Sequence, residues 1–510
     1  MKLFEKGLSG NKLFGNKRSG NKMPGNKRSG KRENRKTSEE KSNKNILRLT
    51  YAVVLLFAVM IGYESYFLTF RREDVINNTY NARLDSFSDR IVRGKIRSNN
   101  GTVLAETLVG EGGAETRSYP YGPLFAHAAG YSTRGKTGLE AIGNFYMLTS
   151  HINLAEQVVR ELSGGKNPGD DIYTTLDVEL QQTAWDALGD RRGAVVVMEP
   201  DTGKILAMVS KPGYDPNTLN QDWEWMVEDE DGQARLLNRA TQGLYPPGSV
   251  FKLVTLLEYI REHPEDYEDF RFDCGGIYEE GEYKIQCYNR TAHGSVSLEE
   301  AFANSCNGAF ASMGLGLDKA RTRRTAEELL YNSQLPLAVA YSQSAFRMEE
   351  DADTWETLQT YIGQGKTLMT PMHCAMITSA IANGGILMKP YLIDHVEHVG
   401  GETVKQFMPE AYGSLMTAEE AQILTEMMKA VVTVGTGSAV CTEGYTVAGK
   451  TGSAEFETGK ETHGWFTGFA PAGNPQLVIS VIVEESGSGG RTAAPVARAV
   501  LDGWFGRRQD

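Results

Sequence analysis

The order and spacing of the expected elements predict an α+β fold in which an antiparallel sheet is flanked by helices. A helical pattern over 175–188 precedes two strand patterns, 193–198 and 205–209, which are joined by a tight-turn sequence. A long stretch of helical periodicity follows, and strand patterns return only near the end of the chain. Strands grouped at both ends of a helical stretch are typical of an antiparallel sheet, whereas a repeating strand, helix, strand order would predict a parallel one.

The N-terminal segment 1–45 is a basic, low-complexity tail. It contains 14 Lys and Arg against 4 Glu, although the whole chain of 510 residues has a formal net charge of −12. The remainder is therefore strongly acidic, which excludes the charge balance of a nucleic-acid-binding protein. The tail repeats Gly-Asn-Lys every five residues, and its composition predicts disorder. Contact with anionic lipid is favoured over binding to nucleic acid.

A single transmembrane helix is predicted over 46–70. The run 49–62 has no charge and no proline, and its apolar flanks extend it to the roughly 20 residues that cross a bilayer. Glu64 interrupts the distal third, where a charge costs less than at the centre. A cleaved signal peptide or a buried core helix is the alternative, which the long basic extension disfavours. Because positive charge precedes the span, we expect a cytoplasmic N-terminus and an extracytoplasmic remainder.

Two further domains are predicted after this cell-membrane anchor: a small accessory domain over 71–170 and a larger domain over 171–510. At roughly 150 residues per domain, the length suggests about two to four structural units. Turn-forming residues cluster at 164–169, and we place the domain boundary there. The accessory region is mixed in pattern and contains a turn at 99–101.

A serine and a lysine stand three residues apart at the start of a helix predicted over 249–261. Ser249 directly follows Tyr-Pro-Pro-Gly, and Lys252 comes one turn later. Residues i and i+3 share a helix face, so an unprotonated Lys252 amine can take the Ser249 proton as the hydroxyl attacks a carbonyl. The positive end of the helix dipole favours an alkoxide and disfavours an ammonium. The pair therefore predicts acyl transfer.

Two more motifs follow this pair in order and separate it from chance matches. They are Ser305-Cys306-Asn307 and Lys450-Thr451-Gly452-Ser453. The serine–lysine spacing also occurs inside the basic tail, where no active site can form. Each of the other two motifs also has a second match elsewhere in the sequence, here called a decoy. Both decoys precede Ser249, so only one ordered set of three motifs remains.

Helices and strands are predicted around these motifs. A capping box at 297–300 begins a helix whose end delivers Ser305 and Asn307. The other expected helices span 371–383, 418–432 and 493–501, and the expected strands are 446–448, 465–469 and 477–483.

The three ordered motifs resemble those of class B penicillin-binding proteins, the monofunctional D,D-transpeptidases of bacterial cell-wall synthesis. Similar segments also occur at 193–197, 362–365 and 463–469, and in the accessory region at 93–96 and 138–140. The resemblance implies a penicillin-binding transpeptidase fold of the serine β-lactamase type, preceded by one transmembrane helix and a small accessory domain. The accessory region is too short for a glycosyltransferase module, which disfavours a bifunctional class A protein.

The resemblance also implies a role for each motif residue. Ser249 would be the acylated nucleophile and Lys252 its general base. Ser305 would relay a proton to the leaving D-Ala amine, and Asn307 would contact the acyl-side peptide. Lys450 would supply the electrostatics that keep Lys252 neutral.

The last motif would bind substrate. Thr451 and Ser453 would hold the terminal carboxylate of the stem peptide, and the backbone N–H groups of Ser249 and Ser453 would form the oxyanion hole. Gly452 fits a strand edge that must receive a substrate backbone. Cys306 stands where class A β-lactamases have the middle aspartate of this motif, and a small buried spacer is the favoured interpretation.

The function implied is a D,D-transpeptidase that cross-links peptidoglycan stem peptides through a serine acyl-enzyme, releases the terminal D-Ala and is acylated by β-lactams. The implied partners are stem peptides ending in D-Ala-D-Ala, β-lactams, the cell membrane and a glycan-polymerising membrane partner, with no nucleic acid and no cofactor. The alternatives are a membrane-anchored β-lactamase-like hydrolase, which lacks a recognisable deacylation glutamate here, and a penicillin-sensing receptor, which would need several spans. A non-catalytic structural partner is disfavoured by the intact motifs.

Five cysteines leave an odd one, and no metal site is predicted. Zinc is not expected because the sequence has no closely spaced Cys and His pairs. Cys274 and Cys287 flank a Gly-rich, hairpin-like segment. In an extracytoplasmic domain these two residues would either form a disulfide or stay free, and the spacing leaves both open.

Overall fold

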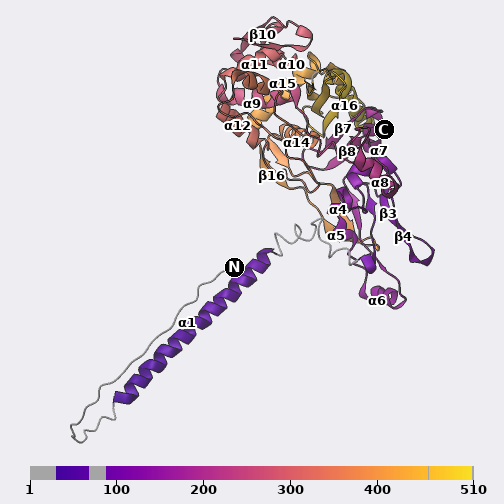
Figure 1. The fold of residues 1–510 in the computed structure, drawn as a ribbon, viewed down its shortest axis with the longest axis vertical. Helices are drawn as coiled ribbons and strands as arrows, with labels where there is room; N and C mark the ends of the chain where they lie inside the picture. The colour runs from indigo at the N-terminus through magenta and orange to yellow at the C-terminus, as the bar shows by residue number, and fades with distance from the viewer. Residues whose placement is uncertain (1–29, 68–87, 458, 508–510) are drawn as a thin grey trace, which may run out of the picture. The chain divides into compact units, whose positions relative to one another are not determined.

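The computed structural model describes residues 30–67, 88–457 and 459–507. It divides into two compact units, residues 1–74 and 75–510. The described part of the first unit is helix α1 (Gly30–Tyr66) (Figure 1). Its segment Asn43–Tyr66 is long and apolar enough to cross a membrane, and its side chains are exposed. Among the described residues, one helix that is long and apolar enough to span a membrane therefore lies close to the predicted position.

Helix α1 begins inside the predicted disordered tail. Because it starts at Gly30, the prediction of disorder is wrong for 30–45. This stretch is rich in Lys, Arg and Glu, which are good helix formers. Extending an existing helix also avoids the cost of nucleating a new one. Residues 1–29 of the tail lie outside the described residues.

A five-stranded antiparallel sheet forms the centre of the second unit, and the predicted α+β architecture is confirmed. The strands are, in spatial order, β17 (Ala448–Ala454), β18 (His463–Ala470), β19 (Leu477–Val483), β7 (Gly193–Met198) and β8 (Ile205–Lys211). Every neighbouring pair is antiparallel. Strands β18 and β19 are buried along their whole length, so helices must cover both faces. Strand β17 is an edge.

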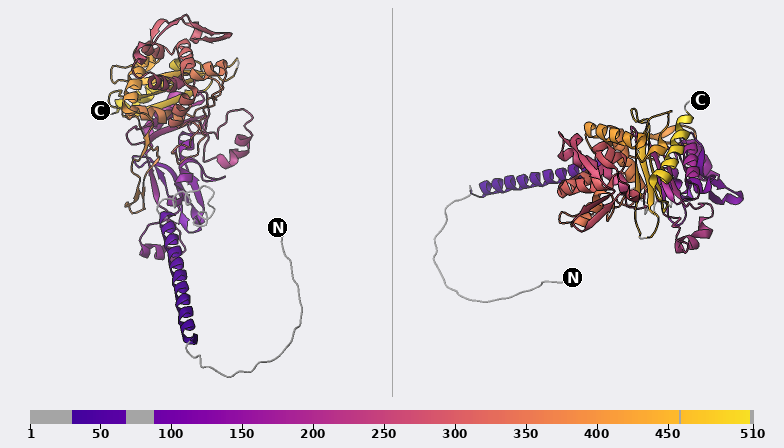
Figure 2. Two further views of the ribbon diagram at one scale, coloured as in Figure 1. Left: turned by 90° about the vertical axis from the view of Figure 1, so that its left-hand side faces the viewer. Right: turned by 90° about the horizontal axis from the view of Figure 1, so that it is seen from above.

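Helices pack on both faces of this sheet (Figure 2). One face is covered by α7 (Val178–Leu188) and α16 (Gly489–Gly506), and the other by α14 (Pro371–Ala382). The remaining larger helices are α8 (Leu219–Glu228), α9 (Lys252–Glu262), α10 (Leu298–Ala303), α11 (Asn307–Gly316), α12 (Lys319–Glu328), α13 (Thr354–Tyr361) and α15 (Ala418–Thr433). A 3₁₀ turn, η5 (Gly248–Phe251), directly precedes α9.

Several predicted element boundaries agree with the structure. Strands 193–198 and 477–483 have the predicted bounds, and the capping box at the start of α10 joins Ser297 and Glu300. Strand β17 differs: it continues to Ala454, so the Lys450 motif lies inside the strand instead of after it. The pairing of β17 with β18 extends this strand through its glycines.

Among its described residues, the second unit also contains four small two-stranded sheets. They pair β9 (Arg271–Cys274) with β12 (Gly294–Ser297), β10 (Ile277–Glu280) with β11 (Tyr283–Gln286), β13 (Ile386–Met388) with β16 (Ala411–Ser414), and β1 (Ile91–Val92) with β5 (Asn167–Pro168).

The accessory layer is a six-stranded sheet with strands from two distant parts of the chain. Its spatial order is β15 (Thr403–Gln406), β14 (Ile393–Glu397), β6 (Asp171–Thr174), β2 (Ile96–Arg97), β3 (Val103–Val109) and β4 (Glu115–Ser118). Its helices are α3 (Ala126–Ala129), α4 (Gly138–Ile142), α5 (Asn144–Met147) and α6 (Leu154–Leu162). Because β14 and β15 return to this sheet from the C-terminal half, residues 75–510 form one compact unit.

A buried ionic network joins the two accessory segments that carry the family resemblance. The fully buried Glu140 carboxylate accepts hydrogen bonds from Arg93 Nε at 2.6 Å and Arg117 Nε at 2.7 Å. Arg117 Nη1 also donates to the Gly94 carbonyl oxygen at 2.8 Å. The network therefore connects β4, α4 and the chain before β2.

We predict that Glu140→Gln lowers the free energy of unfolding by about 3–5 kcal/mol, because it leaves two buried guanidinium groups without a counter-charge. Glu106→Gln is the matched control, since its partner Lys95 is 39% exposed and such pairs contribute at most about 1 kcal/mol. Denaturant unfolding of the full-length chain in detergent measures both values. Equal effects of the two substitutions would contradict this account.

Candidate active site

The three sequence motifs meet at one cleft of about 800 Å³. Its lining includes Ser249, Ser305, Asn307, Thr451, Gly452 and Ser453. The side chains of Lys252 and Lys450 are fully buried. The structure thus places all eight predicted site residues in one place, with the hydroxyl and amide groups at the cleft and the two amines inside the protein.

Ser249 stands on a 3₁₀ turn instead of the first turn of the predicted α-helix. Ser249 lies in η5, and Lys252 begins α9. Gly248 has φ +53°, and a Cβ at Gly363 would lie 1.8 Å from the Gly248 carbonyl oxygen. This close approach requires glycine at 363.

The Lys252 amine is held by oxygen atoms of the second motif. Its Nζ donates to the Ser305 carbonyl oxygen at 2.8 Å and to Asn307 Oδ1 at 2.7 Å, and lies 3.3 Å from Ser305 Oγ. Lys450 Nζ lies 3.0 Å from the same Ser305 Oγ and donates to the Thr451 carbonyl oxygen at 3.0 Å. One hydroxyl therefore lies between two buried amines.

Ser305 is fixed by the junction of two helices. It adopts φ +54° between the end of α10 and the start of α11, a left-handed conformation that costs a non-glycine residue about 1–2 kcal/mol. Cys306 follows as the N-cap of α11, and its Sγ accepts a hydrogen bond from the Ala309 N–H. Cys306 is fully buried, which confirms its interpretation as a small buried residue.

Burial lowers the pKa of both amines. It lowers the pKa of Lys252 to about 8. It lowers the pKa of Lys450 well below its usual value, and the charge of Lys252 lowers it further. The charge effect thus runs from Lys252 to Lys450, whereas the implied role has Lys450 keep Lys252 neutral. Two ammonium groups at one hydroxyl repel each other, so a neutral amine is present near neutral pH.

Strand β17 forms one wall of the cleft. Thr451 Oγ1 lies 2.6 Å from Thr436 Oγ1, and Ser453 Oγ accepts a hydrogen bond from the Gly489 N–H at 3.4 Å. A Cβ on Gly452 would lie 3.1 Å from the Pro247 carbonyl oxygen and 3.0 Å from Trp465 Cβ. This glycine therefore lets β17 pack closely against the turn that carries Ser249, and its predicted place at a strand edge that receives substrate stays a prediction.

Comparison with protein families identifies the two parts of the second unit. Residues 193–502 match the penicillin binding protein transpeptidase domain. The chain belongs to the penicillin-binding protein transpeptidase family. Residues 93–172 match the penicillin binding protein A dimerisation domain.

Relatives place this penicillin-binding protein in class B. Peptidoglycan D,D-transpeptidase PbpA of Mycolicibacterium smegmatis is 32% identical over 90% of this chain and 98% of that protein. Peptidoglycan D,D-transpeptidase MrdA of Acinetobacter baumannii is 31% identical over 76% of this chain and 66% of that protein. The enzyme class predicted from the motifs, a serine-type D,D-transpeptidase, is thereby confirmed.

Solved structures confirm the fold. The D,D-transpeptidase domain of a peptidoglycan glycosyltransferase from Eggerthella lenta has a TM-score of 0.74 at 31% identity, covering 82% of this chain and 99% of that one. Penicillin-binding protein A from M. tuberculosis, as its ceftriaxone acyl-enzyme, has a TM-score of 0.74 at 30% identity with the same coverage.

Three further polar residues of this penicillin-binding protein line the cleft and contact motif residues. Asn307 Nδ2 donates to the Gln286 carbonyl oxygen at 2.8 Å, and Gln364 Nε2 lies 3.4 Å from the Ser453 carbonyl oxygen. Gln364 lies in a segment that resembles the family, and Thr436 lies in the Gly-Thr-Gly turn after a predicted helix, so each had a sequence signal. Gln286 had no sequence signal, because its contact with Asn307 is made by its backbone carbonyl oxygen.

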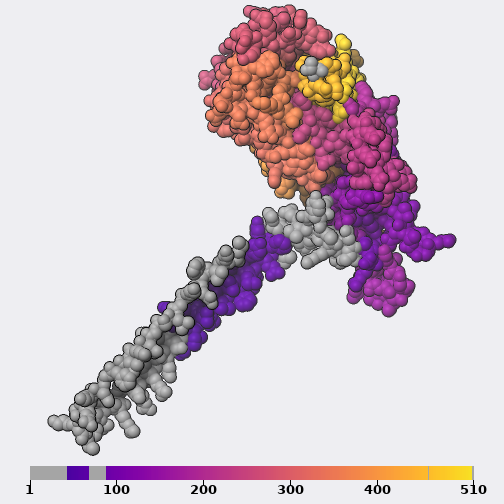
Figure 3. Space-filling view, viewed as in Figure 1, coloured from indigo at the N-terminus to yellow at the C-terminus, as the bar shows by residue number. Residues whose placement is uncertain are grey.

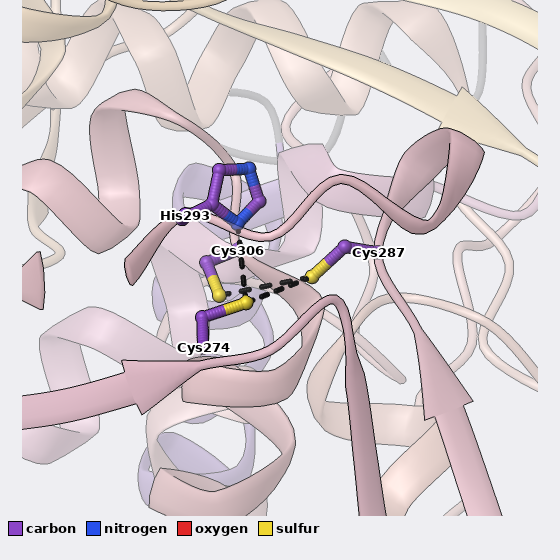
Figure 4. Close-up of side chains that lie close together, drawn as sticks. All are labelled: Cys274, Cys287, His293 and Cys306. Carbon is purple, nitrogen blue, oxygen red and sulfur yellow. Dashed lines mark hydrogen bonds between the residues drawn. The ribbon is translucent and has the colours of Figure 1, made fainter. Parts of the chain in front are cut away.

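Three of the cysteines lie together in the fold (Figure 4). Cys274 and Cys287 are free, with their Sγ atoms 3.6 Å apart, so the disulfide is not formed in this structure. They lie beside His293 and Cys306. Cys and His residues that are not closely spaced in sequence are thus brought together by the fold.

We predict that acylation by penicillin rises with pH and levels off above about pH 8. The neutral Lys252 amine accepts the proton, and each unit below its pKa of about 8 reduces the neutral fraction tenfold. The second-order acylation rate constant, measured from about pH 6 to about pH 10, gives the profile.

Lys252→Arg is the control for this profile, because arginine keeps the charge but has no neutral form in the range. It should slow acylation at least about 10²-fold. A wild-type rate that does not change with pH would contradict the role of Lys252.

Proposed function

We propose that this chain is a membrane-anchored transpeptidase that cross-links peptidoglycan stem peptides through an ester on Ser249 and releases the terminal D-Ala. The observation that carries the proposal is the Ser305 hydroxyl, which lies 3.0 Å from Lys450 Nζ and 3.3 Å from Lys252 Nζ beside the nucleophile turn. Relatives named peptidoglycan D,D-transpeptidase support the substrate class. The cephalosporin and penicillin G acyl-enzymes of a similar protein support acylation by β-lactams.

In the acylation step, Ser249 Oγ attacks the carbonyl carbon of the penultimate D-Ala and Lys252 takes the hydroxyl proton. The C–N bond to the terminal D-Ala breaks, and Ser305 passes a proton from the amine pair to the leaving nitrogen. The backbone N–H groups of Ser249 and Ser453 stabilise the oxyanion, a contribution of about 3–4 kcal/mol per donor in other enzymes.

In the second step, the amine of a neighbouring stem peptide attacks the ester carbonyl and Ser249 leaves. The incoming amine gives up a proton to Lys252, which passes it to the leaving Ser249 Oγ and so restores the Ser249 hydroxyl and the neutral amine. Thr451 and Ser453 line the same cleft, and we assign their hydroxyls to the substrate carboxylate. The positive charge shared by the amine pair attracts that carboxylate.

The site favours a long-lived acyl-enzyme over hydrolysis. One carboxylate, Glu455, is among the described residues that line the cleft, and its side chain is exposed. A β-lactamase-like hydrolase needs a held base that activates water at the ester carbonyl. An exposed side chain beyond β17 does not provide such a position.

The chain divides by function into an anchor over 46–70, an accessory domain over 71–170 and a transpeptidase domain over 171–510. The single apolar helix supports a one-pass anchor. The charge asymmetry of the sequence supports a cytoplasmic N-terminus and an extracytoplasmic catalytic domain. In the plane of the membrane, a glycan-polymerising protein would supply the strands to be cross-linked.

We predict one penicilloyl adduct per chain, located on Ser249 and persisting for many minutes. Intact-mass spectrometry after incubation with penicillin measures the stoichiometry and the lifetime. Ser249→Ala should abolish the adduct and change the thermal unfolding midpoint little, because the partly buried Ser249 side chain lies on a 3₁₀ turn that has no capping hydrogen bond from a side chain. Rapid multiple turnover of penicillin would instead favour the hydrolase.

We predict that protease added to intact protoplasts removes the catalytic domain and leaves 1–45 protected. The reason is the positive charge before the span, which retains that end in the cytoplasm. Immunoblotting with antibodies to an N-terminal tag and to the transpeptidase domain gives the result. Loss of the tag with survival of the catalytic domain would show the opposite orientation.

A further inference from the structure

Helix α6 of the accessory layer presents its apolar side to the outside of the protein. Its sequence places five apolar residues on one side of the helix and its charged residues on the other. The four larger apolar residues and their exposed fractions are Leu154 (76%), Val158 (46%), Val159 (65%) and Leu162 (83%). The polar residues Gln157 and Arg160 are more covered than these. A helix on the surface of a soluble protein has the reverse arrangement, with its apolar side toward the core.

The end of the hairpin formed by β3 and β4 adds two more exposed apolar residues, Leu108 and Val109. Lys166, which follows α6, forms an ion pair with Glu115 at the start of β4, with 2.7 Å between Nζ and Oε1. This pair holds the helix and the hairpin at the same end of the 75–510 unit (Figures 1 and 3). We call the six apolar residues of α6 and the hairpin the α6 surface. Apolar side chains gathered in this way mark an interaction site.

The chain that comes from the membrane anchor enters the second unit beside the α6 surface. Lys166 Nζ donates to the Ser88 carbonyl oxygen at 2.7 Å, and the Asn167 N–H donates to the Arg90 carbonyl oxygen at 2.9 Å. The pairing of β1 with β5 continues this contact. A chain that runs from Tyr66 to Ser88 reaches at most about 75 Å. The α6 surface therefore lies next to the point that the covalent chain keeps within reach of the bilayer.

A lipid surface fits this arrangement better than a second copy of the chain. Six partly exposed side chains form a patch of the size found on ordinary monomers, about 300–600 Å² at the largest, whereas a stable protein interface buries about 800 Å² on each partner. Helix α6 has no buried residue, so it forms a ridge that a fluid bilayer can surround. Because the anchor keeps the bilayer at a high effective concentration, a weak contact is sufficient.

The charges around the α6 surface indicate contact with neutral lipid. Arg160 and Glu156 form an ion pair at 2.8 Å, and Lys166 is paired with Glu115. With two glutamates and one arginine, α6 has no excess of positive charge. Attraction to anionic headgroups is therefore not the force that holds this helix, and the contact depends on insertion of apolar side chains. Such a contact changes little with salt, in contrast to that of a polybasic segment.

We propose that α6 and the end of the β3–β4 hairpin insert their apolar side chains into the surface of the bilayer that carries the anchor, with α6 lying in the membrane plane. The inference rests on the proposed one-pass anchor. Strands β14 and β15 join the accessory sheet to the catalytic half of the unit. The contact therefore fixes the height and tilt of the active-site cleft above the membrane, which the anchor alone would leave variable.

The direct test places a fluorescent label on α6 of the full-length chain, reconstituted at one chain per phosphatidylcholine nanodisc. Cys441→Ser removes the exposed thiol, since the other four cysteines are buried. Leu162→Cys then carries an environment-sensitive fluorophore, and Glu156→Cys on the polar side of the same helix is the matched control. We expect nitroxides on the lipid acyl chains to quench most of the emission from position 162 and little of that from position 156.

A second variant separates docking from folding. Leu154→Glu combined with Val158→Glu should abolish the quenching at position 162, because inserting two carboxylates into the apolar part of a bilayer is costly. The same variant should keep the wild-type rate constant of penicillin acylation, since α6 does not line the active-site cleft. High salt should leave the quenching of the unsubstituted helix unchanged.

Two results would overturn the proposal while leaving the anchor in place. The first is chain that co-elutes with the nanodiscs but shows equal quenching at positions 162 and 156. The second is a label at position 162 that becomes shielded only in vesicles with many chains, without quenching by lipid nitroxides, which would assign the α6 surface to a second copy. Chain that fails to co-elute with the nanodiscs would contradict the anchor itself, and the docking with it.

Discussion

The site depends on two lysine amines buried against a single serine hydroxyl. Ser305 Oγ lies 3.0 Å from the Lys450 amine and 3.3 Å from the Lys252 amine, and neither lysine side chain reaches solvent. Burying two ammonium groups side by side is costly, so at least one amine must be neutral. A neutral amine within reach of hydroxyl groups is what activation of a serine nucleophile requires. The reactivity therefore follows from burial.

Much of the surrounding structure serves to hold this arrangement. Lys252 comes from the helix after the nucleophile turn, Ser305 from the junction of α10 and α11, and Lys450 from the edge strand β17. Glycines at 363 and 452 allow close backbone packing on both sides of the nucleophile turn. The fully buried strands β18 and β19 support β17 from behind. A shift in any of these elements would separate the amines from the hydroxyl.

Local patterns predicted the sheet strands and the motif residues, but not the contacts between distant segments. Strands 193–198 and 477–483 could be read from short apolar runs that are buried on both faces. The return of β14 to the accessory sheet could not, because its pairing with β6 joins residues as distant in the sequence as Asp171 and Glu397. The same limit hid the Cys and His cluster, whose members share no local spacing. Helix α1 is the opposite case. The local composition of 30–45 predicted disorder, but these residues continue the apolar helix that follows them.

The central claim is that the two amines act through one hydroxyl as a unit. A double-mutant cycle tests it most directly, with the second-order rate constant of penicillin acylation measured for Ser305→Ala, Lys450→Ala and the double variant. If the groups act as a unit, the double variant should acylate about as slowly as the slower single variant, as catalytic groups that act together do in other enzymes. A double variant whose rate loss equals the product of the two single losses would contradict the account.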